Sequence, residues 1–243
     1  KSGHCILLDL SPRLSHNQRL EVESIVDRYW PEISKTWTWT SRGKGRVDRL
    51  ALWLGGLANK VIARRFVRIS PDLKREPFII EGGLKLDVGE DIPASIHRMP
   101  KRGEYISILD SALVECGLAK YWLADKIDPE KTFWVESTGR RPQIHHEEKL
   151  TLENKSERTL IQTSGRIIEI FHQQLTPETV DEFVEQAIAN DIKKVTIRTP
   201  LEPSLHPKIQ GSFDRQLARR SGKREGFIIQ HPNSEMSMLC VIE

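Results

Sequence analysis

A run of basic residues between positions 35 and 75 has the clearest chemical potential in this sequence. The segment holds eleven Lys and Arg residues against two acidic residues, Asp48 and Asp72, so its local charge is +9. Cations gathered on one surface neutralise phosphates and give an affinity for nucleic acid that falls as salt rises. We therefore expect the segment to bind an anionic polymer, with DNA or RNA as the partner.

Aromatic residues lie within the same segment. Trp37 and Trp39 alternate with threonines, which places both indoles on one face of a predicted strand. An indole stacks on any base, for roughly 1–3 kcal/mol per base. The pattern predicts stacking by the two tryptophans and phosphate contacts from five cations that lie in or near the following glycine-containing loop and strand: Arg42, Lys44, Arg46, Arg64 and Arg65. Burial of both indoles in the core is the alternative, because Trp is mostly buried in folded proteins.

A second basic element is predicted on a helix over residues 212–220. Arg215 and Arg219 lie one turn apart on the same face of this helix, and Lys223 and Arg224 follow it. We expect Arg215 and Arg219 to be a second set of nucleic-acid contacts. Cations at the end of a helix also stabilise its dipole, by about 0.3–1 kcal/mol, which is the alternative explanation.

Two aspartates are the candidates for catalysis. Asp9 and Asp110 each end a short apolar segment with the pattern of a buried strand. If the two strands were parallel neighbours, both carboxylates would lie at one sheet edge and could hold Mg²⁺ for phosphodiester cleavage. The favoured interpretation is that each aspartate caps the helix that follows, and Asp110-Ser111 suits that role. Otherwise the sequence predicts no cofactor or metal site, and whether the chain is an enzyme stays open.

The sequence His145-His146-Glu147-Glu148 is interpreted as part of a polar surface linker. Adjacent residues of a strand point to opposite faces, and no HExxH spacing or cysteine pair accompanies the histidines. The pattern therefore does not predict a metal site here.

Composition bounds the class of protein. The 243 residues are 38% hydrophobic and 29% charged, with a net charge of +3, which is typical of a folded chain. The longest apolar run, residues 51–58, is far below the roughly 20 residues that a membrane helix needs. Three widely spaced cysteines give no disulfide framework. We expect a cytoplasmic protein with no membrane partner.

Two domains are predicted. All six tryptophans lie in the first 134 residues, and a polar stretch covers residues 137–157. Residues 1–149 carry 25 basic and 21 acidic residues (+4), whereas residues 150–243 carry 12 and 13 (−1). The sequence thus predicts an N-terminal α/β domain over 1–149, with the basic segment, and a C-terminal α/β domain over 150–243.

Hydrophobic periodicity predicts a mixed α+β class. Helices are expected over residues 16–30, 47–62, 111–125 and 212–220, with another that begins at the Thr176 cap. Strands are expected over residues 5–10, 36–40, 66–69, 78–81, 105–109, 133–136, 160–171, 194–198, 227–230 and 236–242. The C-terminal part fits a small α/β sandwich with two helices packed on a sheet.

Together these features predict a nucleic-acid-binding protein that is a component of a larger nucleoprotein assembly and contacts other protein subunits. Two alternatives stay open. One is a metal-dependent nuclease or phosphotransferase that uses Asp9 and Asp110. The other is a protein-interaction domain whose basic segment meets an acidic partner.

Overall fold

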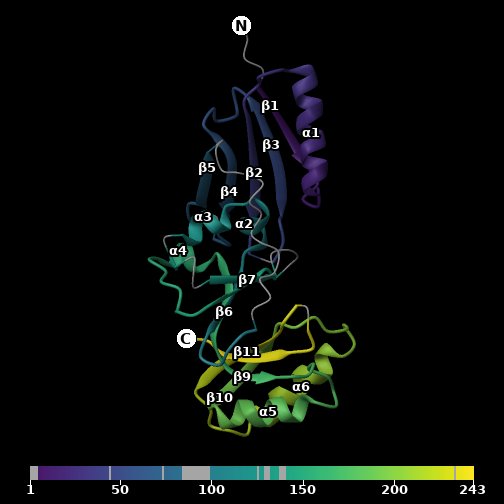
Figure 1. Cartoon of the computed structure of the whole chain (residues 1–243), viewed down its shortest axis with the longest axis vertical. Helices are drawn as coiled ribbons and strands as arrows, with labels where there is room; N and C mark the ends of the chain where they lie inside the picture. The colour runs from purple at the N-terminus through teal and green to yellow at the C-terminus, as the bar shows by residue number, and fades with distance from the viewer. Residues whose placement is uncertain are drawn as a thin grey trace.

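The chain forms two β-sheets with helices packed against them, so the predicted α+β class is confirmed. The computed structural model describes residues 5–43, 45–72, 74–83, 99–124, 126–128, 132–136, 141–232 and 234–243. Figure 1 shows an elongated molecule with one sheet and helix α1 at one end and helices α5 and α6 at the other.

The first sheet has the strand order β1-β3-β2-β4-β5. Its strands are β1 (Cys5–Leu10), β2 (Lys35–Ser41), β3 (Arg49–Gly55), β4 (Ile62–Arg68) and β5 (Phe78–Gly83). Neighbours are antiparallel except for β2 and β4, which are parallel. Helix α1 (His16–Tyr29) begins at Ser15, whose hydroxyl accepts from the backbone N–H of Gln18 in a capping box.

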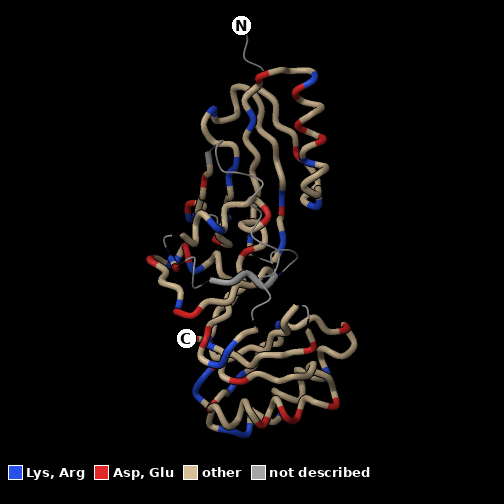
Figure 2. The backbone as a smooth tube through the Cα atoms, in the orientation of Figure 1, with Lys and Arg blue, Asp and Glu red and all other residues tan. Residues whose placement is uncertain are grey.

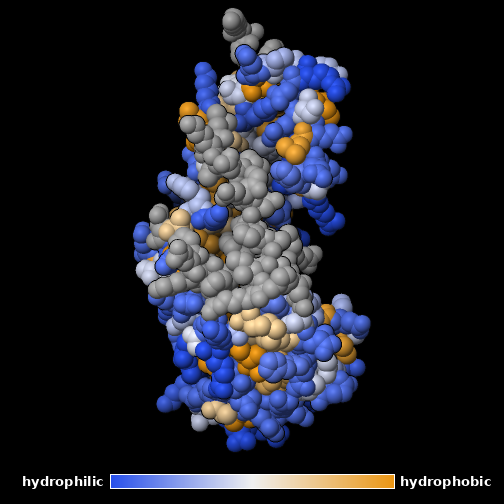
Figure 3. All heavy atoms as spheres, in the orientation of Figure 1, coloured by the Kyte–Doolittle hydropathy of each residue, from blue (hydrophilic) through white to orange (hydrophobic). Residues whose placement is uncertain are grey.

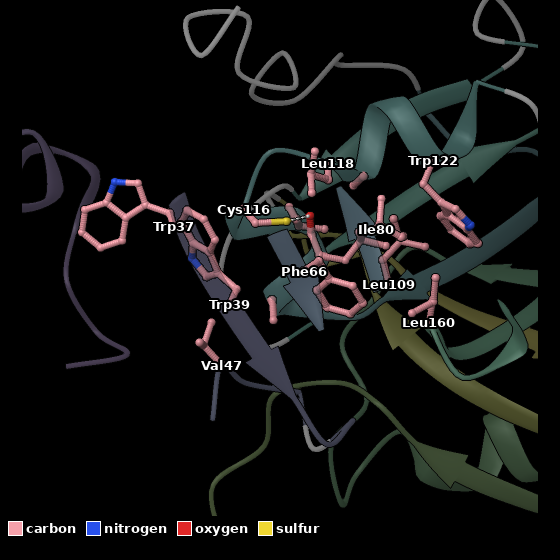
Figure 4. Close-up of a cluster of buried hydrophobic side chains, with 14 of the residues drawn as sticks. Trp37, Trp39, Val47, Phe66, Ile80, Leu109, Cys116, Leu118, Trp122 and Leu160 are labelled. Carbon is pink, nitrogen blue, oxygen red and sulfur yellow. Dashed lines mark hydrogen bonds between the residues drawn. The ribbon is translucent and has the colours of Figure 1, made fainter. Parts of the chain in front are cut away.

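One face of this sheet forms a buried core with the helices. The register pairs Trp37 with Leu52 and Trp39 with Leu50, so these side chains share a face with the buried Val26 of α1. The same core includes α2 (Ser111–Glu115) and α3 (Ala119–Leu123). Figure 4 shows the two indoles in one cluster with Val47 and Phe66.

The predicted helix over residues 47–62 is wrong. Leu50, Leu52 and Leu54 are all buried in strand β3, where they alternate with residues that point to the other face. The spacing of Leu50, Leu54 and Leu57 also satisfies a helical period, which is why the sequence favoured a helix. The strand ends at Gly55, whose positive φ of 63° suits glycine and starts the turn toward β4.

The second sheet has the order β10-β11-β12-β9-β6-β8-β7. Its strands are β6 (Tyr105–Leu109), β7 (Thr132–Glu136), β8 (Gln143–His146), β9 (Ile161–Phe171), β10 (Ile192–Ile197), β11 (Arg224–Gln230) and β12 (Ser237–Val241). This sheet contains strands from both sides of residue 150, and the two-domain division at 149/150 stays a prediction.

Two helices cover one face of the second sheet. Helix α5 (Val180–Ala189) and helix α6 (His206–Leu217) bury Phe183 and Phe213 against residues of β10, β11 and β12. A separate apolar cluster that includes Ile106, Phe227 and Met238 lies on the opposite face. Strands β10 and β11 are parallel and α6 connects them, so this part contains a βαβ unit.

Two further predictions need correction. The helix expected over 111–125 is split into α2 and α3, because Gly117 has a φ of 75° that a helix interior does not allow. The expected polar linker instead contains strand β8, in which His145 and His146 are 2% and 0% exposed, and the short helix α4 (Lys155–Arg158). Within the described ranges, every helix is too short or too polar to cross a lipid bilayer.

Candidate nucleic-acid interface

The loop between β2 and β3 displays cations around one carboxylate. The Asp48 side chain accepts a hydrogen bond from the backbone N–H of Arg42 at 2.6 Å and lies 3.3 Å from the Arg42 guanidinium. Arg46 Nε lies 4.0 Å from the same carboxylate. Asp48 is nearly buried, whereas the Arg42 and Arg46 side chains are more than half exposed. We call residues 42–49 the basic loop; Lys44, predicted to contact phosphate, lies outside the described residues.

Four other cations of the basic segment, including Arg68 described below, pair with acidic residues from outside the segment. Arg49 lies 3.1 Å from Asp9, and Arg65 lies 2.6 Å from Glu81. Lys35 pairs with Asp27. These carboxylates belong to β1, α1 and β5, outside the stretch over which the charge was summed, so the folded surface is less positive than the +9 of the segment.

Arg64 and Arg65 do not form one phosphate site. They are consecutive residues of β4, so their side chains point to opposite faces of the sheet. Arg64 Nη1 donates to the carbonyl oxygen of Cys116, whereas Arg65 pairs with Glu81 on the other face. A single ligand therefore cannot contact both guanidinium groups from one side.

The two candidate stacking residues are in the core. Trp37 is 5% exposed and Trp39 is 3% exposed. The Trp37 indole N–H donates to Glu23 at 2.5 Å, and the Arg19 guanidinium lies 5.5 Å from the centre of the Trp39 ring. Burial beside this ring lowers the pKa of Arg19. In this arrangement neither indole offers an open face to a base, and we leave both out of the proposal below.

A buried ion pair links the two sheets. Asp110, which ends β6, accepts hydrogen bonds from the Ser41 hydroxyl at 2.5 Å, from Arg68 Nη1 at 2.8 Å and from the backbone N–H of Ala112 at 2.9 Å. Burial raises the pKa of Asp110, against the opposing effect of these hydrogen bonds. The Arg68 guanidinium fills the space beside Gly43, where any Cβ would overlap it. Asp110 thus caps α2, as the favoured interpretation expected, and holds the end of β4. The same interpretation is wrong for Asp9, because the N-cap of α1 is Ser15.

The structure does not bring Asp9 and Asp110 together. Asp9 belongs to the edge strand β1 of the first sheet, is exposed and pairs with Arg49. Asp110 follows a strand of the second sheet and is 1% exposed. No group of three or more His, Cys, Asp or Glu side chains suited to a metal ion occurs in the described part of the chain. The geometry therefore gives the nuclease alternative no support.

A second basic surface lies where α6 ends and β10 begins. A Cβ at Gly222 would lie 2.7 Å from the backbone of Ile192, so the segment after α6 runs against the start of β10. This contact gathers five exposed cations, which we call the α6–β10 patch: Lys193, Lys194, Arg219, Arg220 and Lys223. Figure 2 shows blue residues along this edge, beside β10.

The cations of the α6–β10 patch make no ion pairs with the residues that the structure describes, although Asp191 and Glu225 lie nearby in the chain. Arg215, in the last turn of α6, is also exposed, and its Nε donates to the carbonyl oxygen of Gly211. The helix expected over 212–220 ends at Leu217, so Arg219 lies after the helix and not on its face. The predicted residues Arg215 and Arg219 are therefore available to a phosphate-bearing partner.

Sequence reasoning missed Lys193 and Lys194. The sequence Ile192-Lys193-Lys194-Val195 places both lysines at the start of a strand, and their link to the 219–223 region depends on the parallel pairing of β10 with β11. The two adjacent lysines were a visible signal, but only the tertiary structure joins them to the cations after α6.

The surface also carries scattered apolar side chains. On α1, Ile25 is 46% exposed and Tyr29 is 67% exposed. On the face that Figure 3 shows, hydrophilic residues predominate over apolar ones. Isolated apolar residues are usual on a protein surface and do not by themselves define a partner site.

Comparisons with known proteins establish the fold but no family. No family model matches the chain, and no curated protein matches its sequence. A crystal structure described as that of a putative methyltransferase from Porphyromonas gingivalis W83 is similar, with a TM-score of 0.53 and 13% identity. The match covers 98% of this chain and 51% of that chain, so this chain spans about half the length of its structural neighbour.

Proposed function

We propose that this chain binds nucleic acid through the α6–β10 patch, with the basic loop as a second contact, as a component of a larger assembly. The α6–β10 patch carries the proposal, because it combines five exposed cations without ion pairs among the described residues. Unpaired cations on a surface are free to replace the counterions of phosphates. The basic loop is secondary, because Asp48 already neutralises part of its charge.

The test is the binding of fluorescent single-stranded and duplex oligonucleotides at several salt concentrations. We expect binding at low salt. The logarithm of the association constant should fall linearly as the logarithm of the salt concentration rises. Parallel titrations with DNA and RNA identify the preferred polymer. Absence of binding to all four ligands at low salt would contradict the proposal, and the protein-interaction alternative with an acidic partner would then take its place.

A second candidate function is a role in methyl transfer. It is favoured by the match of nearly the whole chain to about half of the neighbour described as a methyltransferase. If the chain itself transfers methyl groups, incubation with labelled S-adenosylmethionine and nucleic acid gives label in the nucleic acid. If no label is transferred and calorimetry shows no binding of S-adenosylmethionine, the chain is not an independent methyltransferase.

The nuclease alternative has its own test. Incubation with Mg²⁺ and an end-labelled oligonucleotide is compared between the wild type and the D9A and D110N variants. We expect no cleavage, because Asp9 lies in β1 of the first sheet and Asp110 follows β6 of the second. Cleavage that both substitutions abolish would support the nuclease instead.

A further inference from the structure

The carboxyl edge of the βαβ unit carries a cluster of polar residues that the proposed surfaces do not include. Arg198 and Thr199 follow β10, and Gln230 and His231 lie at the end of the parallel strand β11. Ligands of α/β folds bind outside the carboxyl ends of parallel strands, where the loop from strand to helix begins. Here this loop leads from Arg198 into helix α6.

Strand β8 adds side chains to the same edge from across the second sheet. In the strand order, β8 is separated from β11 by three strands. Nevertheless Gln143 Nε2 donates to the carbonyl oxygen of Gln230 at 3.4 Å, and the rings of His145 and His231 are 6.2 Å apart. The second sheet therefore curls over its inner apolar cluster, and β8 meets the end of β11.

The cluster contains two arginines side by side. Arg141 Nη1 donates to the carbonyl oxygen of Arg198. Both arginines are half-buried, so each keeps part of its surface accessible. Thr199 is 3% exposed, and its hydroxyl donates to the amide oxygen of Gln230 at 3.2 Å. These contacts fix the position of the loop that carries Arg198.

One atom of Arg198 and one of Gln143 have no hydrogen-bond partner among the residues that the structure describes. Arg198 Nε is buried without a hydrogen-bond partner in the described part of the chain, and no carboxylate described there lies within ion-pair distance of Arg198. Gln143 is 6% exposed, and its Oε1 is also buried without a partner. Buried polar groups in folded proteins are normally hydrogen-bonded, so an unpaired donor and an unpaired acceptor within one polar cluster point to a ligand.

The pair of unpaired atoms defines the chemistry of that ligand. Two arginines in one polar cluster favour a phosphate, whose oxygens accept several N–H bonds in a fork geometry. The unpaired oxygen of Gln143 needs a donor, which a phosphate does not offer but a sugar hydroxyl or a base amino group does. A nucleotide unit carries both groups.

We propose that Arg198 and Arg141 bind a phosphate group of a nucleic-acid strand, with Gln143 Oε1 accepting from the sugar or base of the same nucleotide. This inference rests on the proposed function, because these residues would bind one nucleotide of the same nucleic acid. The α6–β10 patch lies at the other end of β10. It would then contact phosphates further along the nucleic-acid strand, whatever the base sequence.

The test compares the wild type with R198Q and R198K in binding to oligonucleotides that carry a 5′-phosphate, a 3′-phosphate or no terminal phosphate. The matched control is R102Q. It removes an exposed arginine that precedes the start of β6, whereas Gln143 pairs with Ile108 near the end of that strand. We expect R198Q to weaken binding by about tenfold, the size typical for a lost charge-assisted hydrogen bond. The affinity of R198K should lie between those of R198Q and the wild type, and R102Q should bind like the wild type.

The three oligonucleotides identify the source of the phosphate. A loss confined to one phosphorylated end assigns a terminal phosphate, and an equal loss for all three assigns an internal phosphodiester; either result supports the site. Binding by R198Q equal to that of R102Q for every oligonucleotide overturns it. If the proposed function itself is wrong, the wild type binds none of the three oligonucleotides, so the two failures can be told apart.

Circular dichroism and thermal unfolding of R198Q and R198K show whether a loss of binding reflects misfolding. A second variant, Q143E, places a negative charge beside the phosphate and must weaken binding if the site is real.

Discussion

The basic segment of the first sheet and the α6–β10 patch of the second contain similar residues in different surroundings. Arg49, Arg65 and Arg68 pair with carboxylates from other elements. The cations of the α6–β10 patch have no ion pairs among the described residues. A local sum of charge in the sequence ranks the first region higher, whereas the exposed unpaired cations favour the second. Other elements bring distant acids to the first region, and no acid among the described residues pairs with the α6–β10 patch.

Removal of a paired cation is expected to have the largest effect, on stability. R68A leaves the buried Asp110 carboxylate without its cation, and breaking a buried pair costs about 3–5 kcal/mol. Urea unfolding measures this loss. The matched control R49A removes an exposed partner of Asp9 and should cost less than about 1 kcal/mol. Equal losses for R68A and R49A would show that the Arg68–Asp110 pair does not hold the two sheets together.

The second sheet buries a neutral titratable group instead of an ion pair. His146 receives a hydrogen bond from, or donates one to, Ser107 Oγ at 2.8 Å, and burial lowers the pKa of His146 to about 4. Its pKa in the unfolded chain is about 6.5, so the unfolded state binds the proton more readily between these values. Stability therefore falls as the pH drops from about 6.5 to 4, by up to about 3 kcal/mol.

Urea midpoints at pH 7 and pH 4.5 measure this effect. In H146Q the difference between the two midpoints should shrink, because the titrating ring is gone. In H172Q, which removes an exposed histidine, the difference should stay as in the wild type. An unchanged difference in H146Q would assign the acid sensitivity to other groups.

The smallest effect is expected at the basic loop. The double variant R42Q/R46Q removes two exposed cations that share the Asp48 carboxylate, so nucleic-acid binding should weaken only by about three- to fivefold. Fluorescence anisotropy at low salt measures the change, with R13Q/R28Q as the control of equal charge. A loss greater than that of the α6–β10 patch variants would reverse the ranking of the two regions.

Local signals in the sequence predicted several elements well. The spacing of apolar residues over 16–30 predicted helix α1, and Asp110 was predicted to cap α2, because both signals depend on residues within a few helical turns. The sequence pattern of β3 was ambiguous, because its leucines fit the period of a helix as well as that of a strand. This segment is a strand because it pairs with β1 on one side and with β2 on the other.

The candidate site was harder to predict. Arg215 and Arg219 were proposed from a helical spacing, although α6 ends at Leu217, before Arg219. Lys193 and Lys194 join Arg219 only through the parallel pairing of β10 and β11. Trp37 and Trp39 were placed on one face of a strand correctly, yet the sequence does not show that α1 covers this face. Arg198 and Gln143 meet through the curl of a seven-stranded sheet, which no local pattern encodes.

The most direct test of the account is the salt dependence of binding by the variant K193Q/K194Q/R219Q/K223Q. Its control is R13Q/R28Q/K155Q/R158Q, which removes the same charge from other exposed positions. Each lost phosphate contact lowers the slope of log K against log salt by about 0.7–0.9, so the patch variant should lose roughly 3 units of slope and the control almost none. Equal slopes for the two variants would contradict the claim that the α6–β10 patch binds nucleic acid.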